Sequence, residues 1–485
     1  MMRSLYSGVS GLKNHQTRMD VVGNNISNVN TTGFKSSRVT FSDTLSQTLS
    51  GASAPTENRG GTNPKQIGLG SATSAIDTLF TDGSVQSTGV NTDLCLSGNG
   101  LFIVKDGNLS YYTRNGNFKF DKQGYYVNSD GLKVQGWSAT TPGDAINTNG
   151  QPSEICIPAG KTMAASATKV ATFSKNLDAA EPRIKSMSVT YVDGTTADVP
   201  AGTTAAVEVG KDFDAGAGAK KVASITLKMT DGTTTTETSG AFKLNNSKPK
   251  TTIATIYDSL GNAHNVTIYM TKTEVSSKNG NKWTISLDPA GTNKQTITES
   301  DGTTTTVNMT DLELQFDVNG GLKTGSGTAT LTLTNGAGDN QSVNLTFDDV
   351  TQYAGSSTAF ATTDGNAAGT LKSVSIDSSG VITGTYTNGL NVQEAQVAIA
   401  QFNNASGLTK TGNSLYTESN NSGTPNIGTI SDLGCTVTPS SLEMSNVDMA
   451  SELTDMIVTQ RGYQSNSKII TVSDELLETL INMKR

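Results

Sequence analysis

The side chains best suited to acid–base or nucleophilic chemistry in this chain are its two histidines. His264 lies shortly after Asp258 in the segment TIYDSLGNAHNVTIYM, and a His–Asp pair can activate a nucleophilic Ser or Cys. No such nucleophile stands nearby, and no G-x-S-x-G motif occurs. We therefore interpret residues 258–262 as a hairpin turn, with His264 opening the returning strand. His15 falls on a helical stripe, where a packed or interface histidine is expected.

The other residue types that could bind a metal or a nucleotide form no convincing set. Cys95, Cys156 and Cys435 are odd in number and include no C-x-x-C pair, which argues against a disulfide framework and a zinc cluster. The GNG at 98–100 precedes a strand rather than a helix, so it is interpreted as a turn. Glu443 lacks an acidic partner at the spacing of a catalytic carboxylate pair. The sequence thus predicts no catalysis, cofactor, metal or small-molecule substrate.

Composition indicates a β-rich protein with many turns. Charged residues make up 16% of the chain and glycine reaches 50 residues. The net charge of −8, without a basic stripe, predicts no nucleic-acid partner. No apolar stretch is as long as the ~18 residues of a membrane span. No continuous apolar region follows Arg3, so we expect no cleaved signal peptide, and export would need a dedicated machine.

Both ends of the chain show helical periodicity. Near the N-terminus apolar residues recur every seven positions, and from about 446 to 481 a second stripe alternates spacings of four and three. Gly8 and His15 weaken the first stripe, and Gly462 should cost the second about 1 kcal/mol relative to Ala. The second stripe consists of Met449, Leu453, Met456, Gln460, Tyr463, Ser467, Ile470, Asp474, Leu477 and Ile481.

Such stripes can be buried in two ways. The two helices can pack within one monomer, or they can meet the helices of other copies, and periodicity alone does not choose between these arrangements. The stripes lie at the extreme ends of the chain, separated from the β regions by connectors of low hydrophobicity, which favours assembly between copies. The residues predicted to form the polymer interface are Leu5, Leu12, Met19, Ile26, Leu453, Met456, Tyr463, Ile470 and Leu477.

Between the ends, short alternating runs are broken by Asp-Gly and Asn-Gly turns. These runs predict a β meander at 98–137, a second β region at about 169–346 and a third at about 370–418. Segments 42–75 and 419–440 have little periodicity and are interpreted as extended connectors. The expected fold class is multidomain α+β, with a terminal helix at each end and several mostly-β domains between them.

Two long stretches at the ends of the chain carry a resemblance to a known family. The N-terminal stretch is SLYSGVSGLKNHQTRMDVVGNNISNVNTTGFKSSRVTF, and the C-terminal one is LEMSNVDMASELTDMIVTQRGYQSNSKIITVSDELLETLINMKR. Both resemble the signatures that the flagellar rod, hook and hook-associated proteins share at their two ends. Further similarity lies in GNGLFIVKDG and GLTKTGNSLYTESNNSG. The stretch YDSLGNAHNVTIYMTKT, followed by NKWTISLD, is similar to the outer domain of hook proteins, which the shorter rod proteins lack. The resemblance therefore favours the hook branch of the family.

The resemblance implies a nested fold in which the chain runs outward from a central axis and returns. Residues 1–30 and 447–485 would form the inner coiled-coil domain, and 31–75 with 437–446 the connector. One β domain would combine 76–160 with 347–436. An outer β domain would combine 161–180 with 246–346. Residues 181–245 fall outside the resemblance and look like an inserted, outermost domain.

The family also implies a function. Its hook members are structural subunits that polymerise into a flexible helical tube, a universal joint that transmits torque from rod to filament. The expected partners are copies of the chain itself, rod and hook-associated proteins, the hook cap and the flagellar export apparatus. The expected location is the extracellular flagellum. A distal-rod or hook–filament junction protein, or an adhesin-like surface-binding protein, remains an alternative, and the sequence leaves open whether Cys156 or the nearby Lys161 is modified.

Overall fold

The computed structural model describes residues 2–57, 59–141, 143–216, 218–276, 280–299, 302–323, 327–334 and 340–483. The chain divides into two compact units. The first contains the chain up to Lys161 and from Leu371 onward, and the second contains Thr162–Thr370. A helix lies at each end, and the regular structure described between them is almost all β. The expectation of several mostly-β domains with terminal helices is confirmed.

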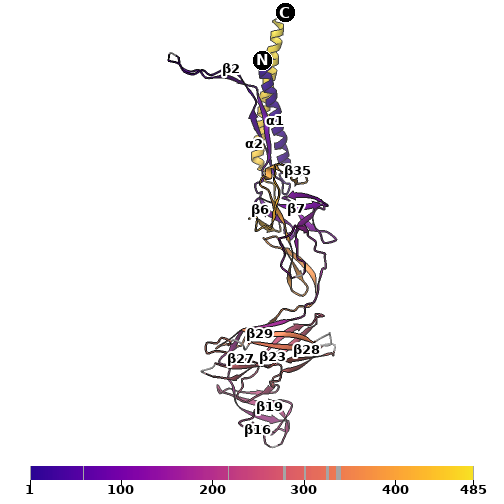
Figure 1. The fold of residues 1–485 in the computed structure, drawn as a ribbon. Helices are drawn as coiled ribbons and strands as arrows, with labels where there is room; N and C mark the ends of the chain where they lie inside the picture. Colours follow the sequence, from indigo (N-terminus) through magenta and orange to yellow (C-terminus); the bar gives the residue numbers. More distant parts are fainter. Residues whose placement is uncertain are drawn as a thin grey trace. The chain divides into compact units, whose positions relative to one another are not determined.

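The first unit begins and ends with a helix. These are α1 (Met2–Ser27) and α2 (Met449–Asn482). They pack side by side and run antiparallel (Figure 1). The two ends of the chain therefore meet within one monomer, which is one of the two arrangements that the heptad stripes allowed.

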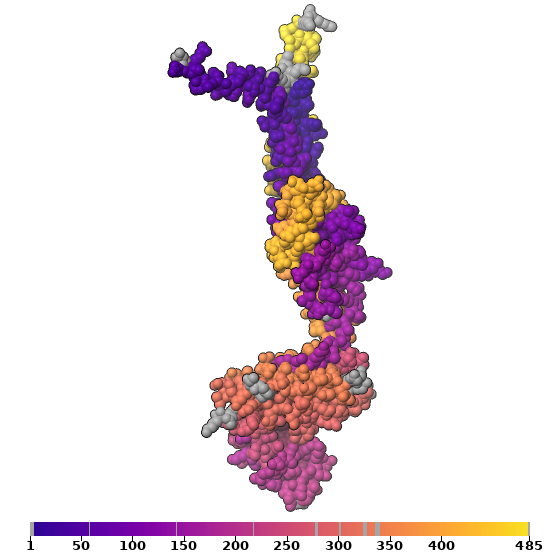
Figure 2. Space-filling view, viewed as in Figure 1, coloured from indigo at the N-terminus to yellow at the C-terminus, as the bar shows by residue number. Residues whose placement is uncertain are grey.

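A long β-hairpin follows α1, where an extended connector was expected at 31–75. Its inner part pairs β1 (Ser37–Asp43) with β4 (Ser71–Thr78), and its outer part pairs β2 (Ser46–Ser50) with β3 (Lys65–Gly68). Every residue of β2 and β3 is exposed, and Figure 2 shows this part as a narrow arm. Strands exposed on both faces need no apolar alternation, so the sequence pattern did not reveal them.

The β part of the first unit takes strands from both sides of the second unit in the sequence. Its sheet includes β7 (Gly100–Asp106), β8 (Leu109–Thr113), β9 (Phe118–Phe120), β10 (Tyr126–Asn128), β11 (Lys133–Ser138), β12 (Ser153–Glu154), β31 (Gly369–Ile376), β32 (Val381–Tyr386), β33 (Asn391–Val397), β34 (Ile399–Gln401), β35 (Thr409–Gly412), β36 (Leu415–Thr417) and β37 (Asn426–Gly428). A 3-10 turn, η1 (Ala405–Gly407), precedes β35. β11 pairs with β7 on one side and β33 on the other, over a core that includes Phe102, Tyr126 and Val397.

Two short strand pairs fasten the segment before α2 to this unit. β6 (Leu94–Ser97) pairs with β38 (Thr436–Pro439), and β5 (Val85–Ser87) pairs with β39 (Ser441–Glu443). The expected connector at 437–446 is therefore largely strand-paired. It carries α2 directly out of the β part of the unit.

The second unit holds two sheets that share one core. The larger sheet consists of β14 (Val170–Asp178), β25 (Lys294–Thr298), β26 (Thr304–Met309), β28 (Thr328–Thr334), β29 (Gln341–Tyr353) and β30 (Phe360–Thr363). The smaller consists of β22 (Lys250–Tyr257), β23 (Ala263–Glu274), β24 (Lys282–Ser286) and β27 (Leu312–Gln315). Trp283 is buried in this core, and Phe173 stacks on Phe347 with ring centroids 4.2 Å apart.

The expected domain boundary at residue 347 is wrong. It falls inside β29, which pairs in parallel with β14, so residues 347–370 belong to the second unit. The physical reason is that the buried alternation of Val343, Leu345 and Phe347 continues through the proposed boundary without a break.

Residues 184–242 form a five-stranded sheet, a separate pair of strands, β17 (Val207–Glu208) with β21 (Ala241–Phe242), and a core of their own inside the second unit. The strands of the sheet are β15 (Ile184–Tyr191), β16 (Thr196–Asp198), β18 (Asp212–Phe213), β19 (Lys220–Met229) and β20 (Thr234–Glu237). Their buried side chains, such as Val189 and Ile225, make a cluster distinct from that of the two sheets above. This segment lies within the predicted insert.

Excising the insert by joining Ala180 to Asn246 should leave the rest of the chain folded. The ends of the insert lie close together, because the Ile184 N–H donates to the Asn246 carbonyl over 2.8 Å. Calorimetry is expected to lose one unfolding component and keep the others. The matched variant Ile225→Asp, in the full chain, places a charge in the insert core and should remove the same component. Loss of the remaining β-sheet circular dichroism after excision would contradict an independent insert.

Candidate functional site

The helix pair is the first part of the candidate site. α2 begins at Asp448, whose carboxylate accepts hydrogen bonds from the backbone N–H groups of Ala450 and Ser451. Glu452 adds a negative charge in the first turn, where the helix dipole favours it. These interactions fix the start of α2 immediately after the last strand pair.

The seam between the helices is lined by small and polar residues on α2. Thr459 and Ser473 are its buried residues. Gly462 lies on the same face, against the imidazole of His15. His15, which weakens the first stripe, thus meets Gly462 of the second, since the ring occupies the space that a side chain at position 462 would need.

Polar contacts hold the two helices together near the β part of the unit. Arg18 and Asp455 form an ion pair of 3.0 Å. Asn25 is buried, and its amide nitrogen donates both to Glu452 Oε1 over 2.9 Å and to the Ser37 carbonyl. Burial raises the pKa of Glu452. Asn25 therefore links α1, α2 and the start of β1.

The structure divides the predicted interface residues into two groups. Met456, Ile470 and Leu477 are half-buried on α2, and Ile470 contacts Gly8 of α1. Leu453 and Tyr463 are exposed by 45% and 38%. The four residues on α1, which are Leu5, Leu12, Met19 and Ile26, are all half-buried. No contact with another copy tests these positions, so their part in a polymer interface stays a prediction.

A larger set of apolar residues on the helices and the hairpin remains in water. α2 exposes Ile457 by 59% and Leu476 by 50%. The others are Tyr6 and Val9 on α1, Phe41, Leu49, Ile67 and Ile76 on the hairpin with Leu45 between β1 and β2, and Met449, Val458, Ile469, Val472, Leu480 and Ile481 on α2. We call this set the outer apolar face. The concentration of exposed apolar side chains on the two helices and the hairpin gives this part of the chain the character of an interaction surface.

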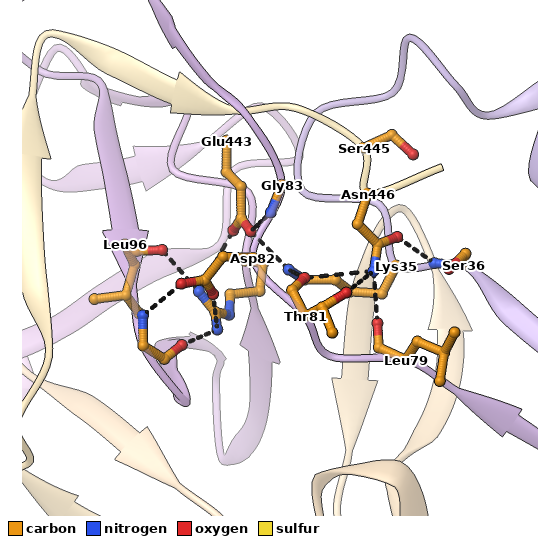
Figure 3. A network of polar contacts seen from close by, with 12 residues as sticks. Lys35, Ser36, Leu79, Thr81, Asp82, Gly83, Leu96, Glu443, Ser445 and Asn446 are labelled. Atoms are coloured by element: carbon orange, nitrogen blue, oxygen red, sulfur yellow. Dashed lines mark hydrogen bonds and ion pairs between the residues drawn. The ribbon is translucent and has the colours of Figure 1, made fainter. Parts of the chain in front are cut away.

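The second part of the site is a buried cluster of charges at the root of the helix pair (Figure 3). Glu443, the last residue of β39, is 1% exposed, and its carboxylate lies between the cations of Lys35 and Arg114, which are 0% and 1% exposed. The Lys35 ammonium is 2.6 Å from Glu443 Oε1, and the Arg114 guanidinium is 3.4 Å from Oε2. These residues come from the segment after α1, the β meander and the segment before α2.

Asp82 forms a second ion pair with Arg114 over 3.3 Å, and backbone groups complete the coordination of these charges. Lys35 donates to the Thr81 carbonyl over 2.6 Å, and Arg114 donates to the carbonyls of Leu96 and Gly98. The Gly83 N–H donates to Glu443 Oε1 over 2.9 Å. A Cβ at position 83 would lie 1.9 Å from the Met444 carbonyl oxygen, so only glycine allows this approach.

Burial sets the electrostatics of the cluster. Loss of water lowers the pKa of Lys35, and the Glu443 carboxylate opposes this shift. Burial, with Glu443 nearby, raises the pKa of the Cys95 thiol to about 11, so that thiol stays protonated. A carboxylate and two cations in this environment stabilise one another strongly, and removing one partner leaves an uncompensated buried charge.

Asn446 extends the cluster toward α2. Its side-chain oxygen accepts from the Ser36 N–H over 2.8 Å, and its nitrogen donates to the Leu79 carbonyl and to Thr81 Oγ1, each over 2.9 Å. Nearby, the Gly33 N–H donates to the Glu443 carbonyl over 2.8 Å. The residues just after α1 and just before α2 are thus held to one another and to the β part of the unit.

Sequence reasoning missed this cluster. In the sequence, Glu443 has no acidic partner at the spacing of a catalytic carboxylate pair, and its cationic partners lie hundreds of residues away. The available signal was weak: Lys35 and Glu443 each fall in the terminal stretches that carry the family resemblance, but one chain gives no means of pairing them.

Asp258 and His264, the pair that resembles part of a catalytic site in the sequence, lie in the second unit at the turn of a hairpin. Asp258 caps the predicted turn by accepting from the N–H groups of Leu260 and Asn262. His264 is buried between Asp258, at 3.5 Å, and Glu299, at 2.8 Å. β22 and β23 flank this turn, so the prediction of a hairpin is confirmed.

Other candidate sites are limited in the described part of the chain. Within it, no group of three or more His, Cys, Asp or Glu residues could hold a metal ion. The three cysteines are free thiols, with Cys95 and Cys435 buried. None of the helices in the described ranges is both long and apolar enough to cross a membrane.

Four flagellar families match successive parts of the chain. Residues 5–35 match the family described as flagella basal body rod protein, and 95–172 match the flagellar hook protein FlgE/F/G D1 domain. Residues 231–366 match the flagellar basal body protein FlaE D2 domain. Residues 438–483 match the flagellar basal body rod FlgEFG protein C-terminal family. Lys35 and Glu443 lie inside the first and last matches.

Whole-length relatives decide which branch of these proteins applies. The chain is 38% identical to the flagellar hook protein FlgE of Treponema pallidum and 39% identical to that of Borreliella burgdorferi, with all of both chains covered in each case. The chain belongs to the flagellar hook protein family. The flagellar basal-body rod protein FlgG of Bacillus subtilis is 48% identical over 36% of this hook-family chain and 69% of its own length.

Substitutions in the buried charge cluster of this hook-family protein should lower the free energy of unfolding by different amounts, in an order that can be tested. Glu443→Leu removes the carboxylate that pairs with the buried Lys35 and leaves Arg114 paired with the partly exposed Asp82, so it should cost about 3–5 kcal/mol. Lys35→Met should cost less, because Arg114 and the Gly83 N–H still serve the carboxylate. Adding Lys35→Met to Glu443→Leu should recover part of the loss. Denaturant unfolding of the three variants measures the order.

A surface pair provides the control. Glu274 and Lys282 are paired at 3.3 Å with both side chains at least one-third exposed, so Glu274→Leu should change stability by less than about 1 kcal/mol. If Glu443→Leu cost no more than Glu274→Leu, the cluster would not be holding the unit together.

Proposed function

We propose that this chain is the structural subunit of the flagellar hook. Copies of it assemble into a flexible helical tube that transmits torque from rod to filament. Support comes from similarity over the full length to proteins named flagellar hook protein FlgE. The matching rod protein covers 36% of the chain, which disfavours a distal-rod role. No observation favours an adhesin or an enzyme.

The observation that carries the proposal is the outer apolar face. A fully buried Leu or Ile side chain contributes about 1.5–3 kcal/mol relative to an exposed one. The exposed residues on α1, α2 and the hairpin therefore offer a large free energy of association once other copies cover them. The terminal helices would then form the innermost, coiled-coil layer of the tube.

The rest of the nested arrangement follows from this placement. Residues 1–30 and 447–485 would be innermost, followed by the connecting segments 31–75 and 437–446. With the corrected boundary, the next β domain combines 76–161 with 371–436, and the outer one combines 162–180 with 246–370. The insert at 181–245 would be outermost. The chain would run outward from the axis and return, and the β domains would slide against neighbours while the inner helices keep the tube continuous.

The same proposal sets the partners and location. The chain would lie in the extracellular flagellum and contact rod proteins at one end of the tube and hook-associated proteins at the other. The hook cap and the flagellar export apparatus would act on it during assembly. It would have no nucleic-acid partner, cofactor or catalytic activity.

Leu476→Glu and Ile457→Glu should each abolish assembly while leaving the free monomer intact. Both side chains are at least half exposed in the monomer, so a charge there costs little until another copy covers it. Sedimentation measures assembly and calorimetry measures the melting temperature of the monomer. The matched control is Ser465→Glu, an exposed polar position on the same helix, which should still assemble. Normal sedimentation of both charged variants would contradict the proposed interface.

Ile470→Glu tests the face of α2 that packs on α1, whereas Leu476→Glu tests the exposed face. Ile470 is half-buried against Gly8, so this charge should disturb the helix pair of the monomer as well as assembly. The expected result is a melting temperature below that of Leu476→Glu. Equal melting temperatures for the two variants would mean that α1 and α2 are not paired in the free chain.

A further inference from the structure

The contact between α1 and α2 contains two places where a glycine of one helix faces a larger side chain of the other. A Cβ on Gly11 would lie 2.7 Å from the amide nitrogen of Asn466, and a Cβ on Gly462 would lie 2.6 Å from Cε1 of His15. Each helix thus presents a glycine and, four residues later, a larger polar side chain. Because the helices run antiparallel, the glycine of one meets the larger side chain of the other.

We propose that these four residues are a register key that fixes how far α1 is shifted along α2. In the remaining seam the most deeply buried residues of α2 are small and polar, Thr459 and Ser473, while Met456, Ile470 and Leu477 are only half-buried, so apolar packing specifies the shift weakly. A polar side chain at such a seam is known to select one register over others, as a buried Asn does in coiled coils. A slip would bring His15 or Asn466 against a residue that has a side chain.

The key matters for assembly because the outer apolar face is shared by both helices. Tyr6 and Val9 belong to α1, and Leu476 and Leu480 belong to α2. A slip of one turn moves these two groups past each other by about 5.4 Å. A neighbouring copy would then meet a different surface. This inference rests on the proposed function and names the residues that position its interface.

Gly23 shows that the glycines of the pair are not equivalent. A Cβ at Gly23 on α1 would have nothing within 4 Å, whereas positions 11 and 462 are filled by the partner helix. Leu has a higher intrinsic helix propensity than Gly, so replacing any of these glycines should favour an isolated helix. If Gly462→Leu weakens the pairing of the helices, the cause is therefore the contact with His15 and not the helix propensity of the new residue.

The test combines a distance measurement with assembly in the full-length chain. Spin labels are attached to cysteines introduced at the exposed positions Gln16 and Ser465, in a Cys156→Ser background, since Cys95 and Cys435 are buried. Gly462→Leu is expected to shift or broaden the label distance by about 5 Å or more, and to raise the protein concentration needed for sedimentable polymer at least tenfold. Adding His15→Ala to the same chain should restore both values.

Gly23→Leu is the matched control and should leave both values as in the unsubstituted chain. The key is overturned if Gly462→Leu changes neither value, if assembly is lost with an unshifted distance, or if His15→Ala fails to restore the pair. Failure of the unsubstituted chain to form polymer would instead contradict the proposed function, because the label distance still tests the key in the monomer.

Discussion

The first unit depends on one carboxylate that has almost no access to water. Glu443 is stable there because Lys35 and Arg114 reach it from other segments. Without Glu443, Arg114 would keep the partly exposed Asp82 as an ion-pair partner, whereas Lys35 would lose the carboxylate that it contacts. The chain must therefore bring the segment after α1, the β meander and the segment before α2 to the same place. Asn446 and Gly33 add hydrogen bonds within a few residues of the two helices. The charge cluster thus determines where both helices leave the β part of the unit.

The most deeply buried residues that α2 contributes to the helix seam are small and polar, and this has a functional consequence. Small and polar residues lie in their seam, while Ile457, Leu476 and many similar side chains face water. A helix pair stabilised mainly by apolar contact would bury these residues internally. Here the buried charge cluster around Glu443 fixes the start of the helix pair, and the apolar surface of the pair remains available to other copies. The β cores of the second unit, closed around Trp283 and around Ile225, need no such partner.

The sequence predicted the two helices, the β meander and the turn before His264, because each has a local signal in periodicity or turn residues. It did not predict the hairpin at 37–78, whose outer strands are exposed on both faces and show no alternation. It placed a boundary at 347, inside a strand whose partner lies about 170 residues earlier. The apolar stripe of α2 included Leu453 and Tyr463, which lie outside the seam, because the true contact uses Gly and polar residues that hydrophobic periodicity ignores. The Glu443 cluster depends on residues far apart in the sequence, so no local pattern could reveal it.

Amide hydrogen exchange, compared between the unassembled chain and its polymer, tests the central claim most directly. If copies associate through the terminal helices and the hairpin, amides of α1, α2 and β1–β4 should exchange much more slowly in the polymer. These elements are largely exposed to water in the monomer, so contact with other copies would protect them most. The sheets of residues 162–370 should change far less, because their cores are already closed. Protection gained mainly in residues 162–370, with none in the helices, would contradict the account.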